Sequence, residues 1–389
     1  MQRPAGAPSA RDVLRRAVDD IALIDHHAHS VMAADLDRPA FENAMTEAHH
    51  RPTPPATAFD SQLGFAVRRH CAPVLGLEPF ASPDAYLDRR SELGSAETTR
   101  RLVAAAGIAL ALVDHGHAAE RLLSPEDFTA TTGVPTLPVV RLEHEAERAF
   151  QTAKDPDDLV RTIGARLEAA RTGAAGFKTI AAYRTGLAFD PEPPDDDEVR
   201  TAAAEWLAAG DPRLRHPVLI RHLVWWALRR RAVLQVHTGF GDPDLLLADA
   251  NPLHLQPLIA RAAGTGAVIA LLHCHPFERE AAYLCHAFPR VVMDVGLAVP
   301  HLGARSIDSV RQALGLAPLH TVLFSTDAWG LPELYLLGAR LWRDAMVSVL
   351  GDHVEAGEWA LDDAVRVAGM IGRGNAERVY GLPTEGEGP

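Results

Sequence analysis

The segment Ala22–His29, with the sequence ALIDHHAH, is a short apolar run that ends in a cluster of histidines. In an extended strand, residues i and i+2 point to the same side. His27 and His29 can therefore converge on one metal ion, because the strand itself fixes their relative positions. A bare His-x-His also occurs in histidine-rich turns, so the metal interpretation depends on the rest of the chain.

Three further apolar runs end in the same way, at His237, His273 and Asp327. The predicted strands alternate with helical stretches and are Ile21–Asp25, Ile108–Asp114, Pro135–Glu143, Gly176–Tyr183, Ala232–His237, Ala267–His273, Val291–Val295 and Thr321–Asp327. This α/β pattern predicts a (β/α)8 TIM barrel. An open doubly wound sheet is less favoured, because histidines rather than a glycine-rich phosphate loop follow the first strand.

Residues 31–100 interrupt the alternation with helical pieces around a proline-rich patch, Arg51–Pro55. We expect a single barrel domain over residues 1–389, with residues 31–100 as a helical insertion after the first strand. Loops at the carboxyl ends of barrel strands surround the mouth. The insertion is therefore expected to form a lid or a subunit interface and to influence substrate choice.

The composition limits the partners of this chain of 389 residues. Its net charge of -13 argues against nucleic acid or an anionic membrane surface as a partner. No apolar stretch approaches the ~20 residues of a membrane span. Residues 1–16 contain no apolar secretory segment, and the three cysteines do not suggest a disulfide framework. We expect a cytoplasmic, homo-oligomeric protein that acts on a small molecule.

Polar residues at the predicted strand ends form the candidate site. They are His27, His29, Asp114, His115, Arg141, Glu143, Lys178, His237, His273, Asp294 and Asp327. Imidazole and carboxylate ligands suit zinc, iron, manganese or nickel, and an open coordination position would provide activated water for hydrolysis. Asp327 can bind the metal and accept a proton, and His273 is the candidate to shuttle the proton or polarise the substrate.

The order and spacing of these motifs resemble the amidohydrolase superfamily of metal-dependent TIM barrels. Within it, the closer likeness is to the amidohydrolase domain that occurs alone or fused to glutamine-synthetase-like proteins. The matching stretches extend over nearly the whole chain and are Ile24–His29, Phe177–Arg184, Gln235–Asp242, Leu271–His273, Pro276–Ala281 and Phe324–Ala328.

The resemblance implies a ligand set. His27 and His29 correspond to the metal pair of the first strand, His237 to the ligand on the fifth strand and Asp327 to the ligand on the eighth. His273 matches a histidine that binds a second metal in some branches and acts as acid/base in others. The expected cofactor is a divalent transition metal, zinc first and iron or manganese as alternatives, with one or two ions per chain.

Lys178 lies inside an apolar run, where a lysine is costly unless it is paired, modified or extended toward the barrel mouth. It lies near the position where binuclear relatives carry a carbamylated bridging lysine, and Glu143 is a second candidate for a bridging carboxylate. Lys178 and Arg184 could equally bind a substrate carboxylate. Tyr183 and Arg141 are further candidates for substrate binding.

These features predict a metal-dependent enzyme. The leading hypothesis is a hydrolase that cleaves a C–N bond of the amide type in a small carboxylate-bearing substrate, such as a γ-glutamyl amide. Two alternatives use the same ligand types: non-oxidative decarboxylation or another lyase step, and oxygen activation by a pair of irons. A barrel that has retained its fold and lost its chemistry is the non-catalytic alternative.

Overall fold

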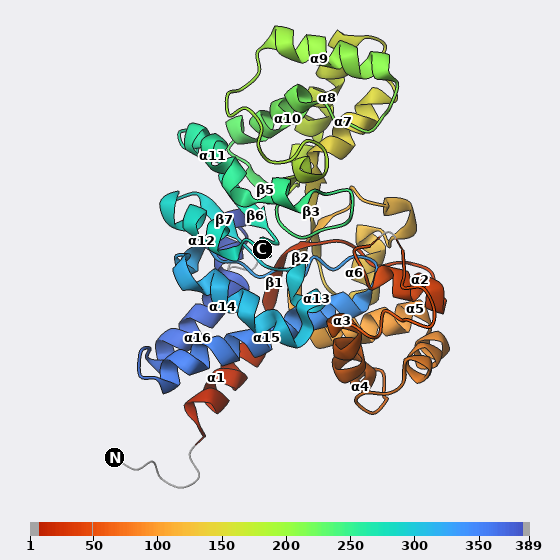
Figure 1. The fold of residues 1–389 in the computed structure, drawn as a ribbon, viewed down its shortest axis with the longest axis vertical. Helices are drawn as coiled ribbons and strands as arrows, with labels where there is room; N and C mark the ends of the chain where they lie inside the picture. The colour runs from red at the N-terminus through yellow and green to blue at the C-terminus, as the bar shows by residue number, and fades with distance from the viewer. Residues whose placement is uncertain (1–7, 49, 384–389) are drawn as a thin grey trace.

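The structure, a computed structural model, describes residues 8–48 and 50–383 of the chain. Its centre is one parallel sheet whose strands follow the order of the sequence. They are β1 (Leu23–Ala28), β2 (Ile108–Asp114), β3 (Thr136–Arg141), β4 (Gly176–Thr179), β5 (Val233–His237), β6 (Val268–Leu272) and β7 (Val291–Met293). The sheet is curled. Parallel neighbours need crossover connections, and the helices of these connections lie outside the sheet (Figure 1).

The predicted eighth strand, Thr321–Asp327, is not a regular strand. Leu323 N donates a hydrogen bond to the carbonyl of Met293 in β7, whereas the carbonyl of Phe324 accepts from His26 N in β1. The segment pairs with β7 only through an isolated bridge between Val322 and Met293, so it does not form a continuous ladder there. The prediction of a closed (β/α)8 barrel is therefore corrected to a barrel-like sheet of seven regular strands, within the described residues.

Helices surround the sheet. Before and within the first crossover lie α1 (Ala10–Asp19), α2 (Arg38–Ala44), α3 (Gln62–Ala66), the π-helix η1 (Val67–Cys71), α4 (Ala72–Val74) and α5 (Pro83–Ala106). The next crossovers contain α6 (Pro125–Thr132), α7 (Leu142–Phe150), α8 (Pro156–Arg171), the 3-10 turn η3 (Ala181–Tyr183), α9 (Asp196–Ala209) and α10 (Pro217–Arg229). The remainder are α11 (Gln256–Ala262), α12 (Glu278–Ala287), α13 (Ala298–Leu302), α14 (Ser306–Leu316), α15 (Pro332–Glu355), α16 (Leu361–Gly369), the π-helix η8 (Met370–Gly374) and α17 (Asn375–Tyr380).

Local sequence signals set several helix boundaries. Ser9 begins α1 with a capping box, and Asp195 begins α9 in the same way, so each satisfies backbone N–H groups that the helix leaves free. Gly107 ends α5 in the left-handed conformation, which glycine adopts without steric cost. Within the described residues, no helix is long and apolar enough to cross a membrane.

Two hydrophobic layers hold the fold together. The larger layer lies between the sheet and the helices. The smaller layer fills the inside of the curl with Ile24, Leu112, Val139, Ala270, Val292, Leu323 and Ala376. Because Ala376 comes from α17, the last helix closes this interior layer. Polar chemistry is thereby confined to the other end of the barrel-like sheet.

β1 contains a bulge at the start of the candidate site. Between Asp25 and Ala28 it has one residue more than the facing segment of β2. A bulge changes the direction in which successive side chains point. His26 and His27 are consecutive, yet both are fully buried, and His26 Nδ1 lies 3.0 Å from the Tyr380 hydroxyl of α17. The bulge therefore directs one histidine to the interior and leaves the next at the site.

The residues predicted as an insertion contain α2, α3, α4 and most of α5. A buried ionic contact connects them to the carboxyl-terminal half of the chain. Arg90 Nε of α5 donates to Glu333 Oε1 of α15 at 2.7 Å, and the Tyr86 hydroxyl donates to the same oxygen at 2.8 Å. The role of this segment as lid or interface stays a prediction.

Removing Glu333 should destabilise the protein strongly. Glu333→Ala leaves the buried Arg90 guanidinium without its carboxylate, so we expect a loss of about 3–5 kcal/mol in the free energy of unfolding. Urea denaturation measures this loss. The matched control is Glu97→Ala on the same helix, where the Arg100 and Arg101 pairs are partly open to solvent and the midpoint should move little. Equal shifts in the two variants would contradict the prediction.

Candidate metal centre

The carboxyl ends of the strands bring histidines and one aspartate together. One ligand atom from each of His27, His273 and Asp327 lies within 4.8 Å of the other two, and all three residues are buried. Asp327 Oδ1 lies 3.0 Å from His27 Nε2 and 3.6 Å from His29 Nε2, while its Oδ2 lies 3.6 Å from His273 Nε2. The two oxygens of one carboxylate thus face different histidines.

Backbone conformation helps to place two of these residues. His273 and Asp327 have φ angles of 71° and 50°, in the left-handed region that residues other than glycine rarely adopt. Each such residue costs about 1–3 kcal/mol and persists where the surrounding structure enforces it. Here the Asp327 N–H donates to the carbonyl of His27, and His273 N donates to Asp294 Oδ1. Hydrogen bonds at the strand ends therefore maintain both conformations.

The predicted ligands His29 and His237 lie beside this group. His29 Nδ1 donates to the carbonyl of Asp114 at 2.7 Å, which leaves Nε2 available as a ligand. The ring of His237 lies 4.6 Å from that of His273, centroid to centroid. The four histidines thus form a row, because the ring of His27 lies 5.3 Å from His29 and 5.7 Å from His273.

Several buried ligand atoms lack hydrogen-bond partners among the described residues. They are His27 Nδ1, His237 Nε2, both ring nitrogens of His273, and Asp327 Oδ1. A buried polar atom without a partner is costly, so such atoms are rare in proteins unless they serve another purpose. Nitrogen and carboxylate atoms that converge without hydrogen-bonding one another fit a divalent transition metal.

The protonation state of the site histidines is also that of metal ligands. Burial lowers the pKa of His27, His29 and His237 well below its usual value, and it lowers the pKa of His273 to about 4. The imidazoles are therefore neutral near pH 7. Neutral imidazole is the form that binds metals.

Lys178 lies against the same group. Its Nζ is 2.8 Å from His27 Nε2 and 3.6 Å from Asp114 Oδ2, and burial lowers its pKa. Burial alone would raise the pKa of Asp114, but the charges of Arg141 and Lys178 outweigh burial and hold it well below its usual range. Lys178 is thus paired with a carboxylate at the site and does not extend into solvent.

Two predicted residues have structural partners. Arg141 donates from Nε and Nη2 to Asp114 Oδ2, at 3.0 and 2.7 Å. Glu143 lies in the first turn of α7 rather than in β3, and its Oε1 accepts from the Thr179 hydroxyl and the Ile180 N–H after β4. The structure therefore places Glu143 at the exit of β4 and not among the histidines.

Two buried carboxylates support the site: Asp294, which was among the strand-end candidates, and Asp25, which sequence reasoning missed. Asp294 Oδ2 lies 2.9 Å from His26 Nε2, and its other oxygen accepts from His273 N. Asp25 accepts hydrogen bonds from both N and Oγ1 of Thr326, and burial raises the pKa of Asp25 to about 8. A carboxylate within an otherwise apolar strand was the available signal, but the Asp294–His26 and Asp25–Thr326 contacts join residues 268 and 301 positions apart in the chain.

A cavity of about 550 Å³ lies over the group and includes His29, Lys178, His237 and Asp327 in its lining. Its walls carry Tyr183, Arg184, Arg213, Asp242, Asp244, His117 and Trp329. The Tyr183 ring lies 4.6 Å from the ring of His237, and Arg184 Nη2 donates to Glu147 at 3.0 Å. All three predicted substrate-binding residues therefore line the same cavity, and Arg141 does so while paired with Asp114.

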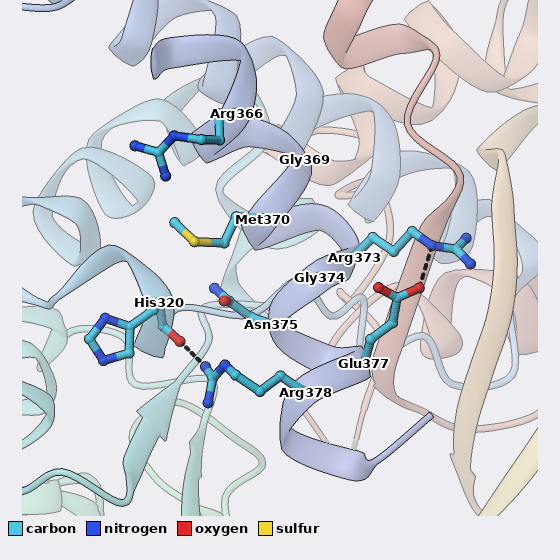
Figure 2. A pocket seen from close by; sticks show the side chains of 9 residues that line it. All are labelled: His320, Arg366, Gly369, Met370, Arg373, Gly374, Asn375, Glu377 and Arg378. Atoms are coloured by element: carbon cyan, nitrogen blue, oxygen red, sulfur yellow. Dashed lines mark hydrogen bonds and ion pairs between the residues drawn. The ribbon is translucent and has the colours of Figure 1, made fainter. Parts of the chain in front are cut away.

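Residues of the predicted insertion also line this cavity. They are Asn43, Ala44, Thr46, Glu47 and Ala48. A separate surface pocket, shown in Figure 2, is formed by α16, η8 and α17 and contains none of the candidate ligands. There Arg373 Nε donates to Glu377 and Arg378 to the carbonyl of His320. This pocket adjoins the helix that closes the opposite end of the sheet, so it is distinct from the candidate metal centre.

Comparisons with known proteins agree with this arrangement. No protein-family model matches the chain. The chain is 34% identical over 224 residues to the protein fluG of Emericella nidulans, a match that covers 53% of this chain and 25% of fluG. The chain therefore matches only a quarter of that longer protein.

Solved structures match nearly the whole chain. A candidate metal-dependent hydrolase from Lactobacillus casei has a TM-score of 0.80 and 25% identity, and the match covers 95% of this chain and 97% of that one. The uronate isomerase from Thermotoga maritima has a TM-score of 0.64 at 11% identity, and the match covers 97% of this chain and 100% of that one. The uronate isomerase from Bacillus halodurans has a TM-score of 0.65 at 13% identity, and the match covers 97% of this chain and 98% of that one. At such identities the isomerases show a shared fold alone.

The fold and the histidine–aspartate group agree with the resemblance of the sequence motifs to metal-dependent enzymes of the amidohydrolase superfamily, and so does the similarity to the metal-dependent hydrolase structure. The prediction from the sequence motifs is thereby confirmed.

The candidate ligands can be tested by metal binding. Asp327→Asn and His27→Ala should each lower the affinity for zinc by at least about tenfold, a loss that mutation of residues outside the ligand set can already cause. Metal titration followed by elemental analysis measures this. His275→Asn is the control, because His275 Nδ1 bonds to Glu278 instead. Full metal retention by both ligand variants would contradict the assignment.

Gly241 should tolerate no larger residue. A Cβ there would lie 2.0 Å from the Tyr183 hydroxyl and 3.0 Å from His237 Nε2. We expect Gly241→Ala to weaken metal binding and lower the thermal midpoint, and the added Tyr183→Phe to restore part of both. Gly369→Ala, where nothing lies within 4 Å, is the control: it should leave metal binding unchanged and should not lower the thermal midpoint, because alanine favours the helix more than glycine does.

Proposed function

We propose that the chain is a hydrolase that cleaves an amide-type C–N bond of a small carboxylate-bearing substrate with metal-activated water. The observation that carries the proposal is the group of neutral, unpartnered histidine nitrogens around Asp327, at the floor of a cavity whose wall contains Arg184. A divalent metal bound there would make water a nucleophile at neutral pH and polarise a carbonyl group.

The remaining roles belong to the chain's own residues. Asp327 is placed to hold the metal through one oxygen and to accept a proton at the other, since its two oxygens face different histidines. His273 Nε2 lies 3.6 Å from Asp327 Oδ2, close enough to pass that proton on after a small shift. Because His273 is neutral near pH 7, it can accept the proton and deliver it to the leaving nitrogen.

Arg184 is the proposed carboxylate ligand. Its side chain is 9% exposed, Nη2 pairs with Glu147, and Nε has no partner among the described residues. The guanidinium therefore retains a donor for a substrate carboxylate. Tyr183 fixes the neighbouring wall against His237. The residues of α2 and the following loop that line the cavity would contribute to substrate choice.

Zinc is the proposed metal, with one or two ions per chain. Asp327 between two sets of histidines would allow a second ion, and Lys178, 2.8 Å from His27 Nε2, would bridge the two if carbamylated. Elemental analysis of protein purified without added metal or chelator decides the stoichiometry. About one zinc supports hydrolysis with His273 as acid/base, whereas about two irons would favour oxygen activation.

The activity itself should depend on metal. We expect removal of the metal by a chelator to abolish hydrolysis of N-acyl and γ-glutamyl amides, and one equivalent of zinc or manganese to restore it. Product analysis by mass spectrometry separates the alternatives: amine and acid indicate hydrolysis, and carbon dioxide without amine indicates decarboxylation. An untouched amide panel with fully loaded protein would contradict the proposal.

Arg184→Gln should act on substrate binding. We expect the KM for carboxylate-bearing amides to rise about tenfold or more, with kcat less affected, because a charge-assisted hydrogen bond to the ground-state substrate is lost. Amides in which the carboxylate is esterified should show little difference between the two proteins. Arg366→Gln, in the separate pocket of Figure 2, is the control.

A further inference from the structure

A second cavity adjoins the one over the candidate metal centre. It has a volume of about 470 Å³ and shares three lining residues, Asn43, Ala44 and Trp329, with the first cavity. Trp329 lies between the two cavities and follows the candidate ligand Asp327 by two positions in the chain. On the first side, the His117 ring lies 5.6 Å from the Trp329 ring.

The second cavity is lined by arginines and, among the described residues, by no carboxylate. Its other lining residues are Met32, Pro39, Ala40, His50, Arg51 and Arg121. No carboxylate is among the lining residues that the structure describes, although the chain has a net charge of -13. Neither Arg51 nor Arg121 forms an ion pair with any described residue, whereas most arginines elsewhere in the chain do. Two arginines without paired carboxylates at an adjoining cavity would suit an anion.

The remaining lining would accept an apolar body. Met32, Pro39, Ala40 and Ala44 provide aliphatic surface, and Trp329 provides an aromatic face with the Arg121 guanidinium 5.8 Å from its ring centre. Pockets that combine apolar walls with a few charged groups orient a ligand by the charge and hold it by the apolar contact. The matching ligand chemistry is an aryl or alkyl chain that ends in a carboxylate or a similar anion.

We propose that this second cavity, the distal chamber, binds the leaving-group end of the substrate, and that this end is apolar and carries an anion at Arg51 and Arg121. The inference rests on the proposed function, because it assigns the chamber to the same substrate whose carboxylate meets Arg184. The substrate is then elongated and carries two anionic groups, one on each side of Trp329.

Binding of 3-phenylpropionate to the zinc-loaded protein tests the chamber without requiring turnover. Titration calorimetry should show that Arg51→Gln and Arg121→Gln each weaken binding about tenfold, the loss expected for one charge-assisted contact. The neutral isostere 3-phenylpropanol should not distinguish these variants from the original protein. Arg366→Gln, in the pocket of Figure 2, is the matched control and should leave the affinity unchanged.

A second comparison excludes binding at the metal. If the probe occupied the first cavity, Arg184→Gln would weaken it and the Arg51 and Arg121 variants would not; that result would overturn the proposal. Trp329→Phe should also remove most of the fluorescence quenching caused by the probe. Because these readouts do not depend on amide cleavage, the chamber can fail while hydrolysis stands, and hydrolysis can fail while the chamber stands.

Discussion

The hydrogen bond from Asp327 N to the carbonyl of His27 is the contact on which the site depends. It connects the last segment of the barrel-like sheet to the first strand at the point where both carry metal ligands. The same segment lacks a regular ladder, so this contact, together with Asp25 and Thr326, fixes its position. Attachment of this segment to β1 and assembly of the metal centre are therefore one structural event.

Burial then gives the assembled residues their chemistry. Because the histidines are buried, they remain neutral. The buried charged groups keep their charge because they are paired, Lys178 with Asp114 and Asp114 with Arg141. The site thus combines ligands that are ready to bind a cation with a rim of fixed charge. This separation suits an enzyme that holds a metal at the floor and recognises anionic groups on the wall.

The helices after β1 extend the site beyond the barrel-like sheet. α2 and the loop that follows it contribute to both cavities, and the ion pair between Arg90 and Glu333 ties the same segment to α15. α15 begins at Pro332, three residues after Trp329, the residue that separates the cavities. Substrate recognition and the stability of the insertion are therefore expected to be linked through one short stretch of chain.

The sequence by itself determined the strand order, the helix caps and the residue types of the metal centre. His27, His29, His237, His273 and Asp327 were visible because each ends an apolar run, and parallel strands bring such ends to one edge. The eight predicted strands correspond to seven regular strands and one irregular segment. Local sequence does not show whether the backbone of a segment will pair regularly with a neighbouring strand.

Only the tertiary structure decided how these residues are used. The bulge in β1 separates His26 from His27, Glu143 leaves the site for the exit of β4, and Arg141 is paired with Asp114. Each of these outcomes depends on partners that are distant in sequence or on a register shift of one residue. Residue type and spacing specify which ligands a chain can offer, but burial and long-range pairing specify which of them remain free to bind.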